Sequence, residues 1–283
     1  MARIVGAVTT SHVPSIGIAM DQRLTEEPYW KPLFDGYERA KEIAAALAPD
    51  VTIVVYNDHG LEVFLDRVPT FGIGAAAEYR PGDEAWGPRP IPPFQGDPAL
   101  SWHLIEHLTA QHFDLTMYQE LSVDHGFTVP MSVFFGDRNG QTDAWPTRVV
   151  PVTVNTIQFP LPQPARCYAL GQAIRRAVEA YPEDLRVLIM GTGGMSHQLQ
   201  GERAGFMMPP FDRMFLKALR DDPLALTRIP LGDYMKGAGH EGAELIMWLL
   251  ARGAIDEAAR EIYQHYHVSA SLTAAGLTCF AAE

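Results

Sequence analysis

Three histidines stand at comparable places in the sequence, each shortly after an apolar run rich in β-branched residues. They are His12 after residues 3–8, His59 after residues 51–56, and His197 after residues 186–190. Such runs are typical of strands buried on both faces, and ligands in parallel sheets gather at the carboxyl ends of the strands. If the strands are neighbours, three imidazoles meet in one crevice, where they can bind a metal or transfer protons.

A metal site of this kind needs an acidic partner, and the segment GHEGAE (239–244) offers two. Two histidines and one carboxylate form the ligand pattern of non-haem Fe(II) oxygenases. Glu244 directly precedes the apolar run LIMWLL, so we expect it to point toward the core, where an unpaired charge is costly and a metal would be a partner. Glu241 is the rival, although the helix dipole also favours an acid in the first turn. The residues favour Glu244 and leave Glu241 open.

Other patterns could carry different chemistry. The segment HEGAE lacks the second histidine of the zinc-protease motif, because Glu244 stands in its place. The glycine-rich run 191–194 lacks the lysine of a phosphate-binding loop and is expected to let the backbone approach a ligand closely. The sequence Asp124-His125-Gly126 is interpreted as a loop, in which an acid beside a histidine could orient a catalytic imidazole.

The elements that must position these side chains alternate between strands and helices. Strands are predicted at 3–8, 51–56, 114–118, 149–154 and 186–190, and helices at 34–48, 99–111, 167–181, 210–221, 240–252 and 256–265. This alternation predicts an α/β fold in which a central, mostly parallel or mixed sheet is flanked by helices. No change of composition marks a boundary, so we expect residues 1–283 to form a single domain with a helical C-terminal third.

The composition narrows the function further. The formal net charge of −12 argues against non-specific nucleic-acid binding, which needs a basic surface. The two cysteines form no CxxC pair, which indicates a reducing, cytoplasmic setting. Neither a signal peptide nor an apolar run of the roughly 20 residues needed to span a membrane is expected.

Several segments together resemble the class III extradiol ring-cleaving dioxygenases, most closely the catalytic beta subunits of protocatechuate 4,5-dioxygenases. The resemblance covers nearly the whole chain. Its motifs are SHVP (11–14), VVYNDH (54–59), EAWGPRP (84–90), VDHG (123–126), GTGGMSHQLQG (191–201) and EGAELIMWL (241–249).

The resemblance implies a role for each matching position. It implies that His12, His59 and Glu244 are the ligands of Fe(II). It implies that His197 is the acid–base residue and His125 a second active-site histidine. It also implies that Ser271 holds the substrate carboxylate and that Asn57 lines the pocket. The implied reaction is extradiol cleavage of protocatechuate by O₂ to a carboxymuconate semialdehyde. Leu272 stands beside Ser271 where the family has a polar asparagine, so gallate, 3-O-methylgallate or another lignin-derived catechol stays open as the substrate.

The resemblance also implies a partner. Family enzymes combine a catalytic beta chain with a small helical alpha chain that caps the pocket, and no segment here resembles that alpha chain. We therefore expect a separate alpha subunit in an α₂β₂ assembly. A zinc-dependent hydrolase on the same scaffold is the alternative from another class.

Overall fold

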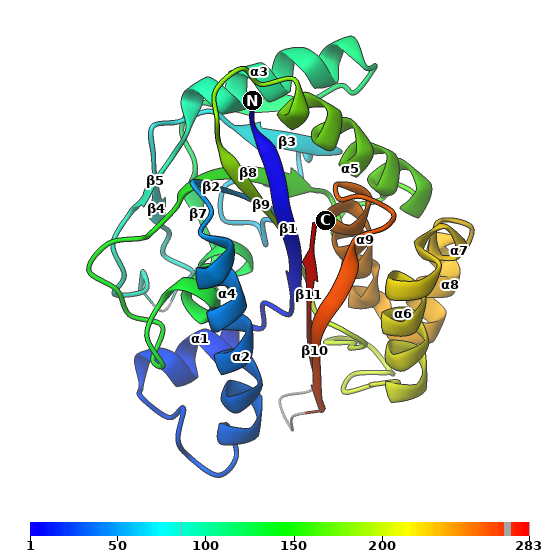
Figure 1. Cartoon of the computed structure of the whole chain (residues 1–283). Coiled ribbons are helices and arrows are strands. Elements are labelled where there is room, and N and C mark those ends of the chain that lie inside the picture. Colours follow the sequence, from blue (N-terminus) through cyan, green and yellow to red (C-terminus); the bar gives the residue numbers. More distant parts are fainter. Residues whose placement is uncertain (86, 269–272, 283) are drawn as a thin grey trace.

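A large mixed sheet forms the centre of the computed structural model, which describes residues 1–85, 87–268 and 273–282 (Figure 1). Within these residues the strand order is β10-β11-β1-β9-β2-β8-β3-β6. The middle four strands run parallel: β1 (Arg3–Thr10), β9 (Arg186–Thr192), β2 (Val51–Tyr56) and β8 (Arg148–Val154). The edges are β10 (Arg260–Val268) and β11 (Ala274–Ala281), antiparallel to each other, and β3 (Phe71–Gly74) with β6 (Thr116–Tyr118).

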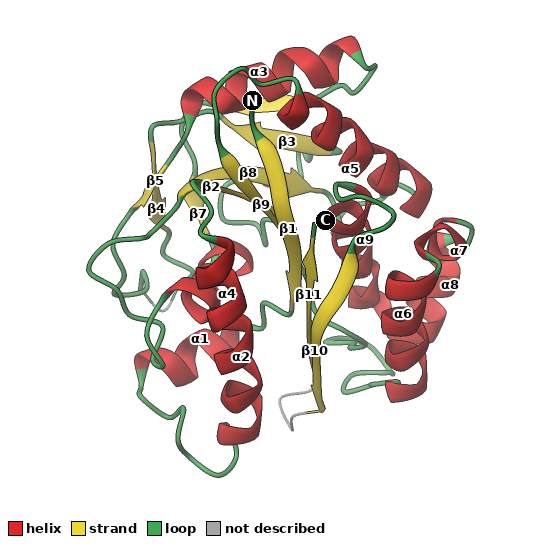
Figure 2. Cartoon of the chain, viewed as in Figure 1, coloured by secondary structure: helices red, strands yellow, loops and turns green. Residues whose placement is uncertain are grey.

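Helices cover both faces of this sheet (Figure 2). One layer is formed by α1 (Pro14–Asp21), α2 (Lys31–Leu47) and α4 (His125–Phe135), and the other by α3 (Pro98–Ala110), α5 (Pro164–Glu179) and α9 (Leu245–Gly253). Alternate residues of β2 belong to opposite cores, since Ile53 and Val55 pack in one cluster and Val54 and Tyr56 in the other. The strand is therefore apolar except at Thr52, because both of its faces are buried.

The remaining elements lie at the periphery of these layers. Helices α6 (Pro209–Asp221), α7 (Pro223–Thr227) and α8 (Leu231–Ala238) lead into the 3₁₀ turn η1 (His240–Glu244), which continues into α9. A small sheet contains β4 (Glu78–Pro81), β5 (Phe94–Gln95) and β7 (Ser122–Val123). Among the described residues, no helix combines the length and apolar character needed to cross a membrane.

The predicted α/β class with a mixed sheet and flanking helices is confirmed, but two local predictions are wrong. Residues 256–265 do not form a helix, because the chain enters strand β10 at Arg260 and pairs with β11, with His265 opposite Leu277. Exposed and partly buried residues alternate over residues 260–265, and this period of two outweighs helix propensity. The VDHG segment is not a loop either, since His125 is the first residue of α4 and Asp124 caps that helix.

Candidate metal centre and active site

The sheet order brings the three strand-end histidines to one edge. Strand β9 lies between β1 and β2 and is parallel to both, so the loops that carry His12, His59 and His197 leave the sheet side by side. All three side chains line one cavity of about 860 Å³. Its other walls include Asn57, His125, Thr156, Ile157, Gln198, Leu199, Glu241, Glu244 and Thr273.

His12, His59 and Glu244 converge inside this cavity. The Nε2 atom of His12 lies 3.2 Å from Oε2 of Glu244, and Nε2 of His59 lies 4.0 Å from Oε1 of the same carboxylate. The ligand atoms of the three side chains all lie within 4.8 Å of one another. His12 and Glu244 are only 4% and 6% exposed. Two imidazole nitrogens and a buried carboxylate at this spacing fit a divalent transition metal.

The far side of each imidazole is already occupied, and this fixes which nitrogen can bind the metal. Nδ1 of His12 lies 2.9 Å from the Oγ1 of Thr192, the last residue of β9. The Nδ1 of His59 donates to Oδ2 of Asp124 at 2.8 Å, and the backbone N–H of His59 donates to the same oxygen at 2.6 Å. Nε2 is therefore the nitrogen of each ring that faces Glu244 and can bind the metal, as in metal sites whose histidines are oriented by a carboxylate or hydroxyl behind them.

The charges of this cluster are strongly coupled. Burial by itself would lower the pKa of His59, but the charge and hydrogen bond of Asp124 outweigh it and raise that pKa to about 9. Burial would raise the pKa of Asp124, and His59 instead lowers it to about 2. Burial likewise opposes ionisation of Glu244, yet His12 above all holds the pKa of this carboxyl well below its usual range. Both acids are thus anionic at neutral pH, as a cation site requires.

Glycines let Glu244 reach this position. Gly193 has φ +133°, and a Cβ there would lie 2.9 Å from the Cβ of Glu244, so a larger residue would push η1 away from the end of β9. The backbone N–H of Gly194 donates to Oε2 of Glu244 at 2.6 Å, and the indole N–H of Trp248 donates to the Gly193 carbonyl at 3.1 Å. The glycine-rich run thus accommodates the segment that carries the carboxylate, and Gly194 also lines the cavity.

The two candidate carboxylates have different surroundings. Glu241 lies at the edge of the cavity, where its Oε2 accepts a hydrogen bond from the backbone N–H of Leu199 at 3.2 Å. It does not belong to the cluster formed by His12, His59 and Glu244. The structure therefore brings Glu244, and not Glu241, to the two histidines.

His125 and His197 enter the same cavity from different elements. The imidazole of His125 lies on that of His59, with 3.9 Å between the ring centroids, and its Nδ1 donates to Oε2 of Glu84. Nδ1 of His197 donates to the carbonyl of Met195 at 2.8 Å. In each ring Nε2 is therefore the nitrogen available for exchanging a proton with a bound molecule.

Two further predicted positions have different outcomes. Asn57 lines the cavity, its Nδ2 lies 3.1 Å from Nε2 of His59, and its buried Oδ1 has no partner among the described residues. Ser271 lies outside the described residues. Sequence reasoning missed the contribution of Asp124, which was considered as a partner of the adjacent His125 but instead holds His59, 65 residues away.

An α/β sheet that presents two histidines and a carboxylate in a cavity with two further histidines is typical of a mononuclear metalloenzyme. The chain matches the family described as the catalytic LigB subunit of aromatic ring-opening dioxygenase over residues 6–280. It therefore belongs to this family, and the predicted class of protein is confirmed.

Characterised relatives agree with this class. The chain is 44% identical over 186 residues to the gallate dioxygenase of Pseudomonas putida, an alignment that covers 66% of this chain and 54% of the relative. It is 31% identical over 196 residues to a 2,3-dihydroxyphenylpropionate/2,3-dihydroxicinnamic acid 1,2-dioxygenase of Rhodococcus jostii, covering 68% and 56%. The chain thus spans about half the length of these relatives.

A solved structure has the same fold. The uncharacterized protein JW3007 from Escherichia coli K12 aligns with a TM-score of 0.61 and 16% identity, over 97% of this chain and 99% of that chain. At this identity the likeness concerns the fold alone.

Proposed function

We propose that this chain is the catalytic domain of an Fe(II)-dependent extradiol dioxygenase that opens the ring of gallate or a closely related catechol acid. The convergence of His12, His59 and Glu244 in one cavity carries the proposal. Two histidines and one carboxylate leave coordination positions open, which suits reactions that bring two substrates to one metal. Bound Fe(II) would supply the redox and templating chemistry that brings an aromatic diol and O₂ together.

Side chains of the protein then accept and return the protons of the substrate. Extradiol cleavage adds both atoms of O₂ to the ring and breaks the C–C bond beside the diol, so no external electron donor is consumed. The phenolic protons must leave the diol and be returned during the reaction. We assign this exchange to Nε2 of His197, with His125 as the second proton-transfer group, because an imidazole can accept and donate protons near neutral pH. The burial of His12 and Glu244 keeps bulk water away from the proposed iron ligands.

Gallate is the first candidate substrate because of the similarity to the Pseudomonas putida enzyme. The dioxygenase that is 44% identical to this chain acts, by its name, on gallate. Protocatechuate, which lacks one of the gallate hydroxyls, is the second candidate, together with 3-O-methylgallate and other lignin-derived catechols. We further propose that Ser271 contacts the substrate carboxylate and that Asn57 lines the substrate's path to the metal.

Oxygen uptake by protein loaded anaerobically with Fe(II) tests this proposal. We expect kcat/KM for gallate to exceed that for protocatechuate by about tenfold or more, because a pocket that hydrogen-bonds a hydroxyl discriminates against the analogue that lacks it. The control is 2,4-dihydroxybenzoate, whose hydroxyls are not adjacent, and it should give no uptake. The opposite ranking would make protocatechuate the substrate, and no uptake with any catechol acid would refute the dioxygenase.

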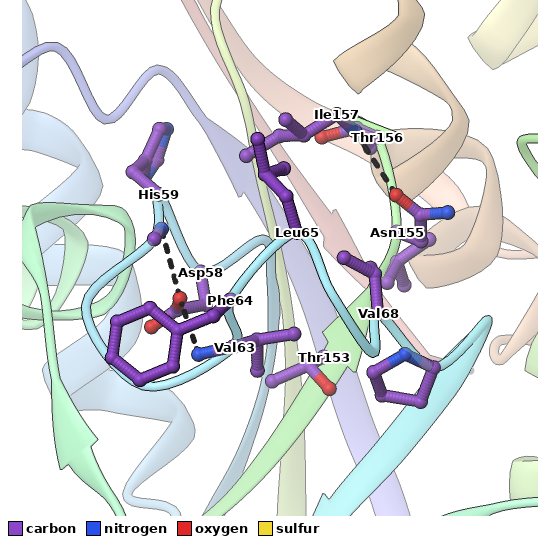
Figure 3. A pocket seen from close by; sticks show the side chains of 13 residues that line it. Asp58, His59, Val63, Phe64, Leu65, Val68, Thr153, Asn155, Thr156 and Ile157 are labelled. Atoms are coloured by element: carbon purple, nitrogen blue, oxygen red, sulfur yellow. Dashed lines mark hydrogen bonds between the residues drawn. The ribbon is translucent and has the colours of Figure 1, made fainter. Parts of the chain in front are cut away.

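A second chain is proposed as well. A neighbouring pocket of about 340 Å³ shares His59, Thr156 and Ile157 with the main cavity, and Figure 3 shows Val63, Leu65 and Val68 along its apolar wall. Phe64 and Leu65 are 58% and 64% exposed there. Apolar surface beside a cavity supports a cap provided by a small alpha subunit in an α₂β₂ assembly.

Size-exclusion chromatography with light scattering, combined with a turnover assay, tests for the alpha subunit. The chain purified from its native host is expected to elute with a small second polypeptide, and removal of that polypeptide should reduce turnover by about tenfold or more, since a cap that excludes water strengthens the site's electrostatics. Full activity of the isolated chain would contradict the need for a cap.

A further inference from the structure

Glu84 makes a contact that the proposed mechanism does not use. Its Oε2 accepts a hydrogen bond from Nδ1 of His125, and the side chains of Glu84 and His125 are only 11% and 9% exposed. The two residues are 41 positions apart in the sequence and come from the segment after β4 and the start of α4. A largely buried carboxylate that meets a histidine of the active site needs an explanation, since burial of a charge is unfavourable without a specific partner.

The hydrogen bond between His125 and Glu84 determines which ring nitrogen of His125 faces the cavity. An ionised carboxylate can only accept, so Nδ1 must carry the hydrogen that joins the two groups. In the neutral ring this leaves Nε2 without a hydrogen and ready to take one. Met195 has the same effect on His197 through its carbonyl oxygen, which accepts from Nδ1 at 2.8 Å. Both proposed proton-transfer histidines are therefore held from behind, as a carboxylate holds the imidazole in serine-protease triads.

The segment that carries Glu84 is fastened to the helices around it. Oδ1 of Asp83 accepts from the backbone N–H groups of Ala85 and Gly87 at 2.9 Å each, which closes a turn around Glu84. Arg89, farther along, donates to both carboxylate oxygens of Asp21 in α1, at 3.0 and 2.8 Å. It also donates to Oγ of Ser132 in α4 at 2.8 Å. The loop is thus tied to the same helix that begins with His125.

Glu84 does not line the cavity that contains the candidate metal ligands. His125 lines both the main cavity and a separate pocket of about 310 Å³, whereas Glu84 lines the second pocket alone. The carboxylate can therefore orient the imidazole without occupying the space that a substrate would need.

We propose that Glu84 is a positioning residue for the ring-opening reaction, and that it acts by holding His125 with Nε2 toward the cavity. This inference rests on the proposed function. It assigns to Glu84, the first residue of the EAWGPRP motif, an indirect role in proton transfer through His125.

Paired substitutions of Glu84 test the inference in the iron-loaded protein. Glu84→Ala removes the acceptor and should lower kcat by about 10- to 100-fold, with KM changed less than about threefold, because proton transfer and not binding is impaired. Glu84→Gln keeps an acceptor oxygen for Nδ1 and should restore kcat to within about threefold of wild type. The matched control is Glu78→Ala, which removes an exposed carboxylate paired with Arg80 in β4 and should leave kcat unchanged.

A double-mutant cycle separates positioning from general stability. If Glu84 acts through His125, Glu84→Ala should have no further effect on kcat in a His125→Ala background, since coupled groups are not additive. A further loss of the same size in that background would overturn the proposal, and so would a Glu84→Ala kcat within twofold of wild type.

A measurement without iron decides the matter even if the alanine variant fails to fold. Nitrogen-15 NMR of histidine-labelled wild-type protein, assigned with His125→Ala, should find Nδ1 of His125 protonated. An Nδ1 without hydrogen would overturn the inference. Failure of the proposed function gives a different result, because wild type and Glu78→Ala would then both lack oxygen uptake while the NMR measurement still reports on His125.

Discussion

Glu244→Ala is expected to leave a folded chain that no longer retains iron. The substitution removes the anionic ligand of the cluster and leaves two imidazoles, which do not neutralise the charge of a metal cation. Metal affinity should fall by more than about 100-fold, beyond the usual effect of an outer-shell residue. The measurement is iron content by mass spectrometry after anaerobic loading and desalting, with circular dichroism to verify the fold.

Two further variants provide a control and an intermediate case for the loss of iron. Glu241→Ala is the matched control and should keep full iron occupancy, because Glu241 bonds the backbone of Leu199 at the cavity edge. Asp124→Asn should have an iron affinity between those of wild type and Glu244→Ala, lowered by about 10- to 100-fold. In this variant His59 keeps a neutral hydrogen-bond acceptor but loses the carboxylate that orients it. Full iron occupancy in Glu244→Ala would contradict the ligand assignment.

His197→Ala should give the opposite pattern, with iron retained and turnover lost. The side chain of His197 is not part of the metal cluster, whereas it lines the cavity with Nδ1 bonded to Met195. A positioned acid–base histidine contributes about 100- to 10,000-fold to rate, and kcat should fall by that factor. Steady-state oxygen uptake and iron content, measured on the same preparation, check both halves of the prediction.

A distant histidine provides the comparison for His197. His107 lies on α3, where its Nδ1 bonds the carbonyl of His103, and His107→Ala should turn over at the wild-type rate. If His197→Ala also worked at nearly that rate, its assignment as the principal acid–base residue would be refuted. Loss of iron in His197→Ala would show instead that this ring supports the metal site.

Much of the scaffold could be predicted because burial leaves a local signature. Strand β2 is apolar at every position except Thr52 since both faces are covered, and β1 and β9 carry similar runs. Strand β10 was missed because it lies at an edge, half of its residues face solvent, and its pairing with β11 depends on residues that follow it. Helix α4 was not predicted at all, and at its start Asp124 both caps the helix and holds His59.

The class of fold, the three histidines at strand ends and an acidic residue at the start of an apolar helix could all be predicted from the residues alone. These follow from residue type and spacing, which local physics translates into strands, helices and their ends. Three contacts depend instead on how the elements pack in space: Asp124 holds His59, Gly193 makes room for Glu244, and Glu84 meets His125. These contacts join residues that are tens of positions apart in the sequence. Their distances are set by the packing of whole helices and strands against one another, and a local sequence pattern contains no information on that packing.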